Sequence, residues 1–148
     1  MMKTDGFILI SFGGIKKNMK KILAYCLMEN HVHLLSVPEK ETSLTRSIGE
    51  TNLLYTQYIN HKYNRSGRLR QNRFISSIVE EEPYLWAVIR YIEQKPVRTK
   101  VVKRVENYGW SSARVHILGR KGEFLSDESR LNEREVKSYR EFLCEDDK

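Results

Sequence analysis

The feature that most constrains the fold is a pair of apolar segments, residues 21–28 and 31–37, separated only by Glu29 and Asn30. Both segments are rich in residues that favour β-strands, and so short a connection is typical of a β-hairpin. Pro38 ends the second segment, because proline cannot donate a hydrogen bond to a strand ladder. We therefore predict two adjacent antiparallel strands near the start of the chain.

The second of these segments holds two of the four histidines, His31 and His33. Alternate residues of a strand point to the same face and lie roughly 7 Å apart, so both imidazoles can lean toward one point. That arrangement suits two ligands of a metal ion. A pair of hydrogen-bonded surface histidines is the competing interpretation, and the pair alone favours it.

Helical periodicity follows the hairpin. Thr42 or Ser43 is the predicted N-cap of a helix over about 44–63, and Pro83 opens a second helix that Pro96 interrupts or ends. The β-rich residues 74–81 predict a third strand. A short helical turn is expected at 97–102, a turn followed by a short helix at 107–118, and a charged amphipathic helix at 129–143. Strands mixed with helices in 148 residues predict an α+β fold, with helices layered on an antiparallel sheet.

The charge distribution indicates a polyanionic partner. Lys and Arg number 26 against 19 acidic residues, a net charge of +7, and no acidic residue occurs between Thr51 and Val79. A basic body of this kind favours a nucleic acid, whereas the competing reading is an ordinary solvated basic surface. The basic residues gathered in this stretch are Lys62, Arg65, Arg68, Arg70 and Arg73.

Two further observations concern the compartment. No run of about 18 apolar residues occurs, so we predict no membrane span, and the N-terminus is too weakly patterned for a signal peptide. Cys26 and Cys144 are the only cysteines and have no metal-type spacing. Two free thiols fit the reducing cytoplasm.

Tyr91 lies in the predicted second helix, beside Arg90 and near Arg98 and Lys100. A phenol with an ordinary pKa of about 10 is a weak nucleophile, which nearby cations and a metal ion can assist. The chain has eight tyrosines. Taken alone, Tyr91 is best interpreted as an ordinary tyrosine that is half-buried on an amphipathic helix.

Three motifs, taken together, resemble a known family. "YCLMENHVHLLSV", "SGRLRQNRFISSIVEEEPYLWAVIRYIEQKPVR" and "YGWSSARVHILG" are similar, in order and spacing, to the single-tyrosine HUH transposases of insertion sequences. The likeness is greatest to their REP-associated tyrosine transposase branch. It covers residues 20–119 and implies a ferredoxin-like sandwich with the histidines on a central strand. We therefore expect a catalytic domain over 1–119 and a charged helical extension over 120–148.

The resemblance also implies a mechanism. His31 and His33 match the histidines that bind one divalent ion, Mg²⁺ or Mn²⁺. Tyr91 matches the nucleophile that attacks single-stranded DNA and leaves a 5′-phosphotyrosine link and a free 3′-hydroxyl. The implied partner is hairpin DNA, and relatives work as monomers or as homodimers. The residues expected to contact its phosphates are Arg65, Arg68, Arg70, Arg73 and Arg98.

The chain departs from the family pattern at three places. Lys95 stands where the family has a polar third metal ligand, commonly asparagine. Two neighbouring residues carry oxygen donors that could replace the missing ligand. Gln94 points about 100° away from Lys95 around the helix and could serve as a substitute, whereas Glu93 points about 200° away and is poorly placed to do so. The family's first strand and crossover helix are represented only by residues 7–12 and the connector 13–20. A crossover needs about a dozen residues or more, so the sheet lacks or rewires this unit. Arg70 replaces a frequent tryptophan.

Two functions remain in competition at this point. The first is a metal-dependent tyrosine transposase or nickase, which the presence of His31, His33 and Tyr91 favours. The second is a catalytically impaired or truncated descendant that binds structured single-stranded DNA without turnover, which Lys95 and the short N-terminus favour. A general RNA-binding module ranks last, because no RNP-type aromatic strand occurs.

Overall fold

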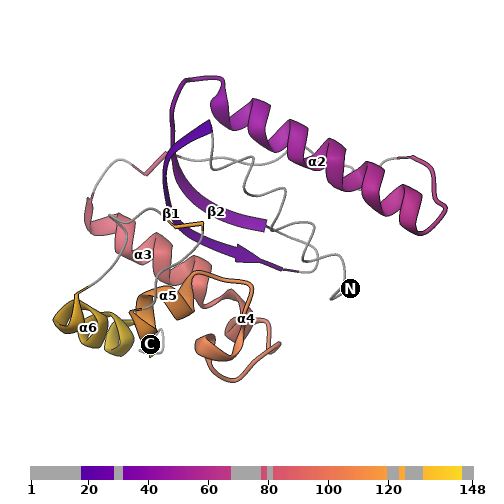
Figure 1. Ribbon diagram of the computed structural model, residues 1–148. Coiled ribbons are helices and arrows are strands. Elements are labelled where there is room, and N and C mark those ends of the chain that lie inside the picture. Colours follow the sequence, from indigo (N-terminus) through magenta and orange to yellow (C-terminus); the bar gives the residue numbers. More distant parts are fainter. Residues whose placement is uncertain are drawn as a thin grey trace. The chain divides into compact units, whose positions relative to one another are not determined.

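The computed structural model describes residues 18–28, 32–67, 78–79, 82–119, 124–125 and 132–144 (Figure 1). These residues form an α+β fold, which confirms the predicted class. The chain divides into two compact units. The first unit comprises Met1–Lys20 and Val37–Ile78, and the second unit comprises Lys21–Ser36 and Val79–Lys148.

The predicted hairpin is confirmed. Strands β1 (Met19–Leu27) and β2 (Val32–Pro38) pair as a two-stranded antiparallel sheet. On its other side β1 meets a segment that was expected only as a turn: Cys26 forms an antiparallel bridge with Ser111, and the Leu27 amide donates to the Trp110 carbonyl at 2.8 Å. Within the described residues, helices beside a sheet of this size agree with a ferredoxin-like sandwich that lacks part of its sheet.

Helix α2 (Ser43–Lys62) belongs to the first unit and confirms the helix predicted there. It begins after Thr42, although the Thr42 side chain makes no capping hydrogen bond. The loop that follows is tied back to the helix, because the Asn60 side-chain amide donates to the Gly67 carbonyl at 2.9 Å. Gly67 adopts φ +91°, a conformation that glycine tolerates best.

The second unit holds the remaining elements. They are α3 (Glu82–Glu93), α4 (Lys95–Arg98), the 3₁₀ turn η1 (Val105–Asn107), α5 (Ala113–Leu118) and α6 (Glu133–Cys144). Pro96 has the predicted effect: it falls in the first turn of α4, where its missing N–H costs least, so the helix is interrupted between α3 and α4. The turn η1 was not predicted.

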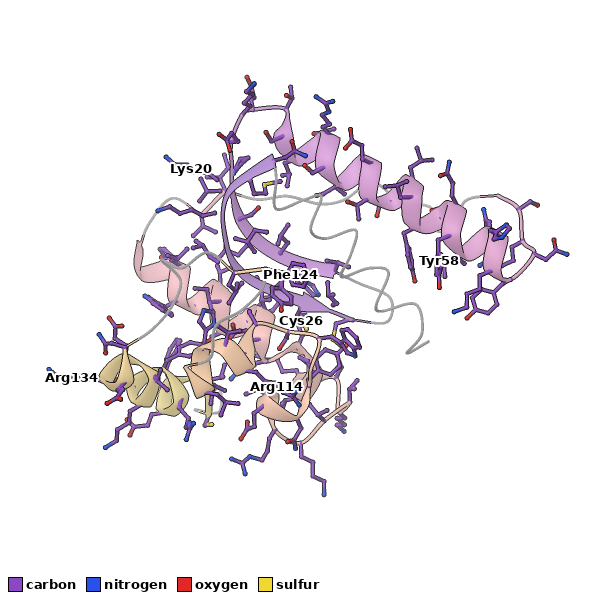
Figure 2. The ribbon with its side chains drawn as sticks, viewed as in Figure 1. Lys20, Cys26, Tyr58, Arg114, Phe124 and Arg134 are labelled. Carbon is purple, nitrogen blue, oxygen red and sulfur yellow. The ribbon has the colours of Figure 1, made fainter. Side chains whose placement is uncertain are left out.

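Helix α3 is amphipathic, and its buried face meets the core of the second unit. Ile89, Ile92, Glu93 and Pro96 are all buried at helical spacing, whereas Tyr91 is exposed. The hydrophobic core around this face consists of Ala24, Cys26, Ile89, Ile92, Val105, Ala113, Ile117, Tyr139 and Leu143. Figure 2 places the Cys26 side chain within this unit and shows Arg114 and Arg134 extending outward.

Two helix ends in this unit have defined caps. Gly119 follows α5 with φ +62°, the left-handed conformation that ends many helices. Before α6, the Glu135 amide donates to the Asn132 side-chain oxygen at 2.9 Å, and the Asn132 amide donates to the Glu135 carboxylate at 2.8 Å. This reciprocal pair is a capping box.

Several expectations fall outside the described residues. The predicted N-terminal strand at 7–12 lies there, as does most of the strand predicted at 74–81; Ile78 and Val79, which are described, are not in a strand. The division into 1–119 and 120–148 stays a prediction. Among the described residues, no helix combines the length and apolar character needed to cross a bilayer.

Candidate functional site

The structure brings together two of the predicted site residues, His33 and Tyr91, in the second unit. Tyr91 lies on the solvent-facing side of α3 and is 47% exposed. The half-buried His33 comes from β2. The two ring centroids are 6.3 Å apart and the ring planes are at 86°, an edge-to-face contact. His31 lies outside the described residues.

Lys95 completes this group from the first turn of α4. Its Nζ lies 4.2 Å from the centroid of the Tyr91 ring, within the range of a cation–π interaction. Residues four apart share a helix face, and the turn continues from α3 into the junction because the Gln94 amide donates to the Arg90 carbonyl at 2.9 Å. The lysine expected near the tyrosine is therefore beside it.

The predicted DNA-binding arginines are only partly described. Arg98 is exposed, and its Nε and Nη2 donate to Gln94 Oε1 at 3.1 and 3.0 Å. Arg65 is exposed in the first unit, just after α2. Arg68, Arg70 and Arg73 lie outside the described residues. The proposed role of this set in binding phosphates stays a prediction.

The oxygen donors next to Lys95 are already engaged. Gln94 donates through Nε2 to the Leu143 carbonyl and accepts from Arg98. Glu93 is fully buried and points into the core. No group of three His, Cys, Asp or Glu side chains that could hold a metal ion occurs in the described part of the chain. Within the described residues the group thus consists of the His33 imidazole, the Tyr91 phenol and the Lys95 cation beside that phenol.

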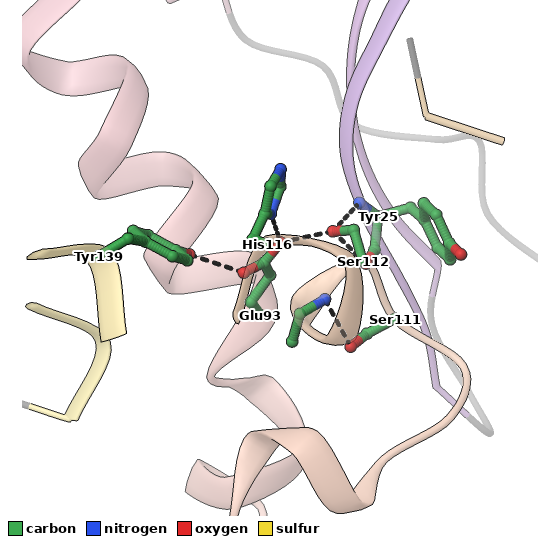
Figure 3. A network of polar contacts seen from close by, with 7 residues as sticks. Tyr25, Glu93, Ser111, Ser112, His116 and Tyr139 are labelled. Carbon is green, nitrogen blue, oxygen red and sulfur yellow. Dashed lines mark hydrogen bonds and ion pairs between the residues drawn. The ribbon is translucent and has the colours of Figure 1, made fainter. Parts of the chain in front are cut away.

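A buried polar network on the opposite face of α3 was not predicted (Figure 3). The carboxylate of Glu93 accepts hydrogen bonds from Ser112 Oγ at 2.6 Å, Tyr139 Oη at 2.6 Å and His116 Nδ1. Ser112 Oγ in turn accepts from the Tyr25 amide of β1 at 3.0 Å. A sequence signal existed, because Glu93 occupies the apolar stripe of α3, and a buried carboxylate requires partners.

This network is structural rather than catalytic. Serine, histidine and glutamate are the residue types of a hydrolase triad, but Ser112 donates to Glu93 and not to the imidazole. Glu93, Ser112 and His116 are all fully buried, so no substrate reaches them. Among the described residues, His116 Nε2 has no hydrogen-bond partner.

The carboxylate of Glu93 dominates the local electrostatics after burial itself. The pKa of the Cys26 thiol is raised from 9.0 to about 12, first by burial and then by the charge of Glu93, with Lys95 opposing the change. The pKa of Tyr139 is raised by burial, by the charge of Glu93 and by the hydrogen bond that Tyr139 donates to it. Both groups therefore stay protonated at neutral pH.

The chain was compared with known protein families, curated proteins and solved structures. Residues 10–95 match the family model described as "Transposase IS200 like", which covers more than half of the 148 residues. The matched range includes His31, His33, Tyr91 and Lys95, and it ends before α5 and α6. Searches of curated proteins and of solved structures found no match.

Proposed function

Because the chain belongs to the IS200-like transposase family, we propose that it cleaves and rejoins single-stranded hairpin DNA with Tyr91 as its nucleophile. The observation that carries this proposal is the contact of Tyr91 with His33, at 6.3 Å between ring centroids. It supports the proposal because a solvent-accessible phenol lies beside one of the two histidines that family resemblance assigns to the metal site.

In the proposed step, Tyr91 Oη attacks the phosphorus of a phosphodiester. The Oη–P bond forms, the P–O3′ bond breaks, the phenolic proton passes to solvent, and the departing 3′-oxygen takes up a proton. The product is a 5′-phosphotyrosine link, which conserves the phosphodiester bond energy. Attack by a new 3′-hydroxyl reverses the step and rejoins the strands without ATP.

Lys95 supports this chemistry electrostatically. Its ammonium lies 4.2 Å from the Tyr91 ring centroid, so a phosphate that reaches Tyr91 Oη also enters the field of a fixed cation. A cation placed before the reaction stabilises the negative charge that develops during the attack. The exposed Arg98 adds positive charge one helical turn further on.

We propose His31 and His33 as the residues that hold a divalent ion, Mg²⁺ or Mn²⁺. Such an ion would polarise the scissile phosphate. Imidazole donors favour transition metals over Mg²⁺, which makes Mn²⁺ the better probe. The remaining ligands would come from phosphate oxygens and water, because Glu93 and Gln94 are engaged elsewhere.

The proposed partner is a folded single strand, as in the REP-associated branch that the motifs resemble. Phosphate contacts would come from Arg65, Arg68, Arg70, Arg73 and Arg98. The net charge of +7 supports a polyanionic partner. A monomer and a homodimer are both compatible with this proposal, as is a cytoplasmic location.

The second candidate is a descendant that binds hairpin DNA without cleaving it. One observation favours it: the position of the family's third metal ligand is occupied by Lys95, whose cation repels a divalent ion. The two candidates share the DNA-binding surface and differ only in turnover.

The deciding experiment is the formation of an SDS-resistant protein–DNA adduct. Wild-type protein, Mn²⁺ and a hairpin strand labelled on the 3′ side of the cleavage site are expected to give a labelled adduct that Tyr91→Phe abolishes. Tyr84→Phe is the matched control, because Tyr84 is also an exposed tyrosine of α3. An adduct that persists in Tyr91→Phe would identify a different nucleophile. Tight hairpin binding by wild type without any adduct would establish the second candidate.

A further inference from the structure

We infer that Glu93 and the C-terminal helix α6 position the nucleophile, so that the described contacts beyond the family match are required for an effective Tyr91. This inference rests on the proposed role of Tyr91. Glu93 follows Tyr91 by two residues and lies on the opposite face of α3: Tyr91 is 47% exposed, whereas Glu93 is fully buried. A change in the rotation or position of this turn moves both side chains together.

The Glu93 carboxylate joins α3 to two other helices. Ser112 and His116, from the N-cap and body of α5, bind Oε1, and Tyr139 from α6 binds Oε2. These hydrogen bonds come from two other helices, α5 and α6. Together they restrict both the shift of the Glu93 turn along the α3 axis and its rotation about that axis. Hydrogen bonds to a buried charge are among the stronger ones, and losing one leaves that charge undersatisfied.

Helix α6 contacts α3 along about two turns of α3. The ring centroids of Trp86 and Tyr139 are 5.5 Å apart, and the guanidinium carbon of Arg90 lies 4.7 Å from the Phe142 ring centroid. At the end of α3, Gln94 Nε2 donates to the Leu143 carbonyl. Positions 86, 90 and 94 recur every four residues, so α6 supports one continuous face of the helix that carries Tyr91.

Glu93, His116 and Tyr139 act here as positioning residues, because none of them touches the reacting atoms. Attack by Tyr91 requires its Oη to be aligned with phosphorus, and a misplacement of about 1 Å can cost on the order of 100-fold in rate. A loosened network is therefore expected to lower the rate of the chemical step without altering the surface that binds DNA.

Tyr139→Phe is the sharpest test, because it removes only the hydroxyl that donates to Glu93. We expect the maximal rate of adduct formation to fall about 10- to 100-fold, while the DNA concentration at half-maximal rate stays unchanged. Tyr84→Phe removes the same group from an exposed position of α3 and is expected to behave as wild type. A normal rate in Tyr139→Phe would overturn the inference.

A second readout does not depend on activity. The ring of Tyr91 lies edge-to-face with His33, so its ring current shifts the His33 Hε1 resonance. Only four histidines are present, and His33→Gln assigns the signal. In Tyr139→Phe this resonance is expected to move, and in Tyr84→Phe it is expected to stay. An unmoved resonance would overturn the inference even if wild type forms no adduct, whereas a missing wild-type adduct alone would refute only the proposed function.

If Tyr139→Phe does not fold, the comparison of His116→Asn with His116→Ala gives the same test. An asparagine amide can place a donor near the position of Nδ1, and alanine cannot. Retention of the His33 resonance and adduct rate by Asn, with loss of both by Ala, would support positioning through the Glu93 hydrogen bond. Equal behaviour of the two variants would overturn it.

Discussion

The ammonium of Lys95 lies 4.2 Å from the centroid of the Tyr91 ring, on the same face of consecutive helical turns. This contact places a fixed positive charge beside the proposed nucleophile. It also places that charge at the position where the resemblance implies a neutral metal ligand. The two effects are opposed: the cation attracts a phosphate and repels a divalent ion.

Lys95→Asn is expected to strengthen metal binding. The substitution removes a like charge and supplies an amide oxygen. Relief of a repulsion of about 1 kcal/mol or more corresponds to a gain of roughly fivefold or more in Mn²⁺ affinity. Isothermal titration of Mn²⁺ into DNA-free protein measures it. Lys103→Asn, at an exposed position, is the control, and equal affinities in the two variants would contradict the proposed repulsion.

The two cysteines are expected to differ in reactivity. Cys26 is buried with a pKa of about 12, whereas Cys144 is exposed. The thiolate is the reactive form, so at pH 8 a disulfide reagent should titrate Cys144 quickly and Cys26 only after denaturation. Cys144→Ser should remove the fast phase. Rapid reaction of both thiols in native protein would show that Cys26 is accessible.

The same pKa predicts a loss of stability at high pH. The folded state holds the Cys26 proton up to about pH 12, but the unfolded chain releases it near 9.0. The unfolded state therefore becomes increasingly favoured as the pH rises from about 9 toward 12. Urea denaturation at pH 8 and pH 10.5 measures the change. Cys26→Ala should show a smaller decline over this interval than wild type.

Two glycines are expected to respond with opposite signs to alanine. Gly49 lies inside α2, and a Cβ added there meets no atom within 4 Å; Gly49→Ala should stabilise by about 0.5–1 kcal/mol through helix propensity. Gly119 has φ +62°, so Gly119→Ala should destabilise by about 1 kcal/mol. Each variant serves as the other's comparison in urea denaturation. Equal signs would contradict the assigned conformations.

The capping box before α6 is expected to contribute about 1 kcal/mol. Asn132→Ala removes the side-chain oxygen that accepts from the Glu135 amide, and loss of such a cap costs roughly 0.5–2 kcal/mol. Glu141→Ala, at an exposed position in the same helix, is the control. A smaller loss in Asn132→Ala than in Glu141→Ala would show that the cap does not stabilise α6.

The helices and strands that depend on short stretches of sequence were predicted well. The hairpin follows from two apolar runs and a short connection, and the break between α3 and α4 follows from Pro96. The bridge between Cys26 and Ser111 did not follow, because it joins residues far apart in the sequence through backbone groups that carry no side-chain signature. The turn η1 was missed because a single 3₁₀ turn has too few residues to show periodicity.

In the candidate site, too, some contacts could be predicted from the sequence and others depend on how the helices pack. His33 and Tyr91 were paired through resemblance, and the structure places their rings in contact. The partners of Glu93 could not be inferred in the same way. Its position in an apolar stripe indicates that partners must exist, but Ser112, His116 and Tyr139 are identified only when helices α5 and α6 are folded against α3.

The hydrogen bond from Tyr139 to Glu93 has a consequence for judging a related gene by its motifs alone. A frameshift that removed α6 would leave the codons of His31, His33 and Tyr91, the residues proposed for the site, intact in the gene. The encoded protein would nevertheless hold Tyr91 on a helix without its contacts to α6, and of its described partners Glu93 would keep only Ser112 and His116. A gene that has lost its 3′ end in this way would therefore still be found by a search for these motifs, although its product lacks α6.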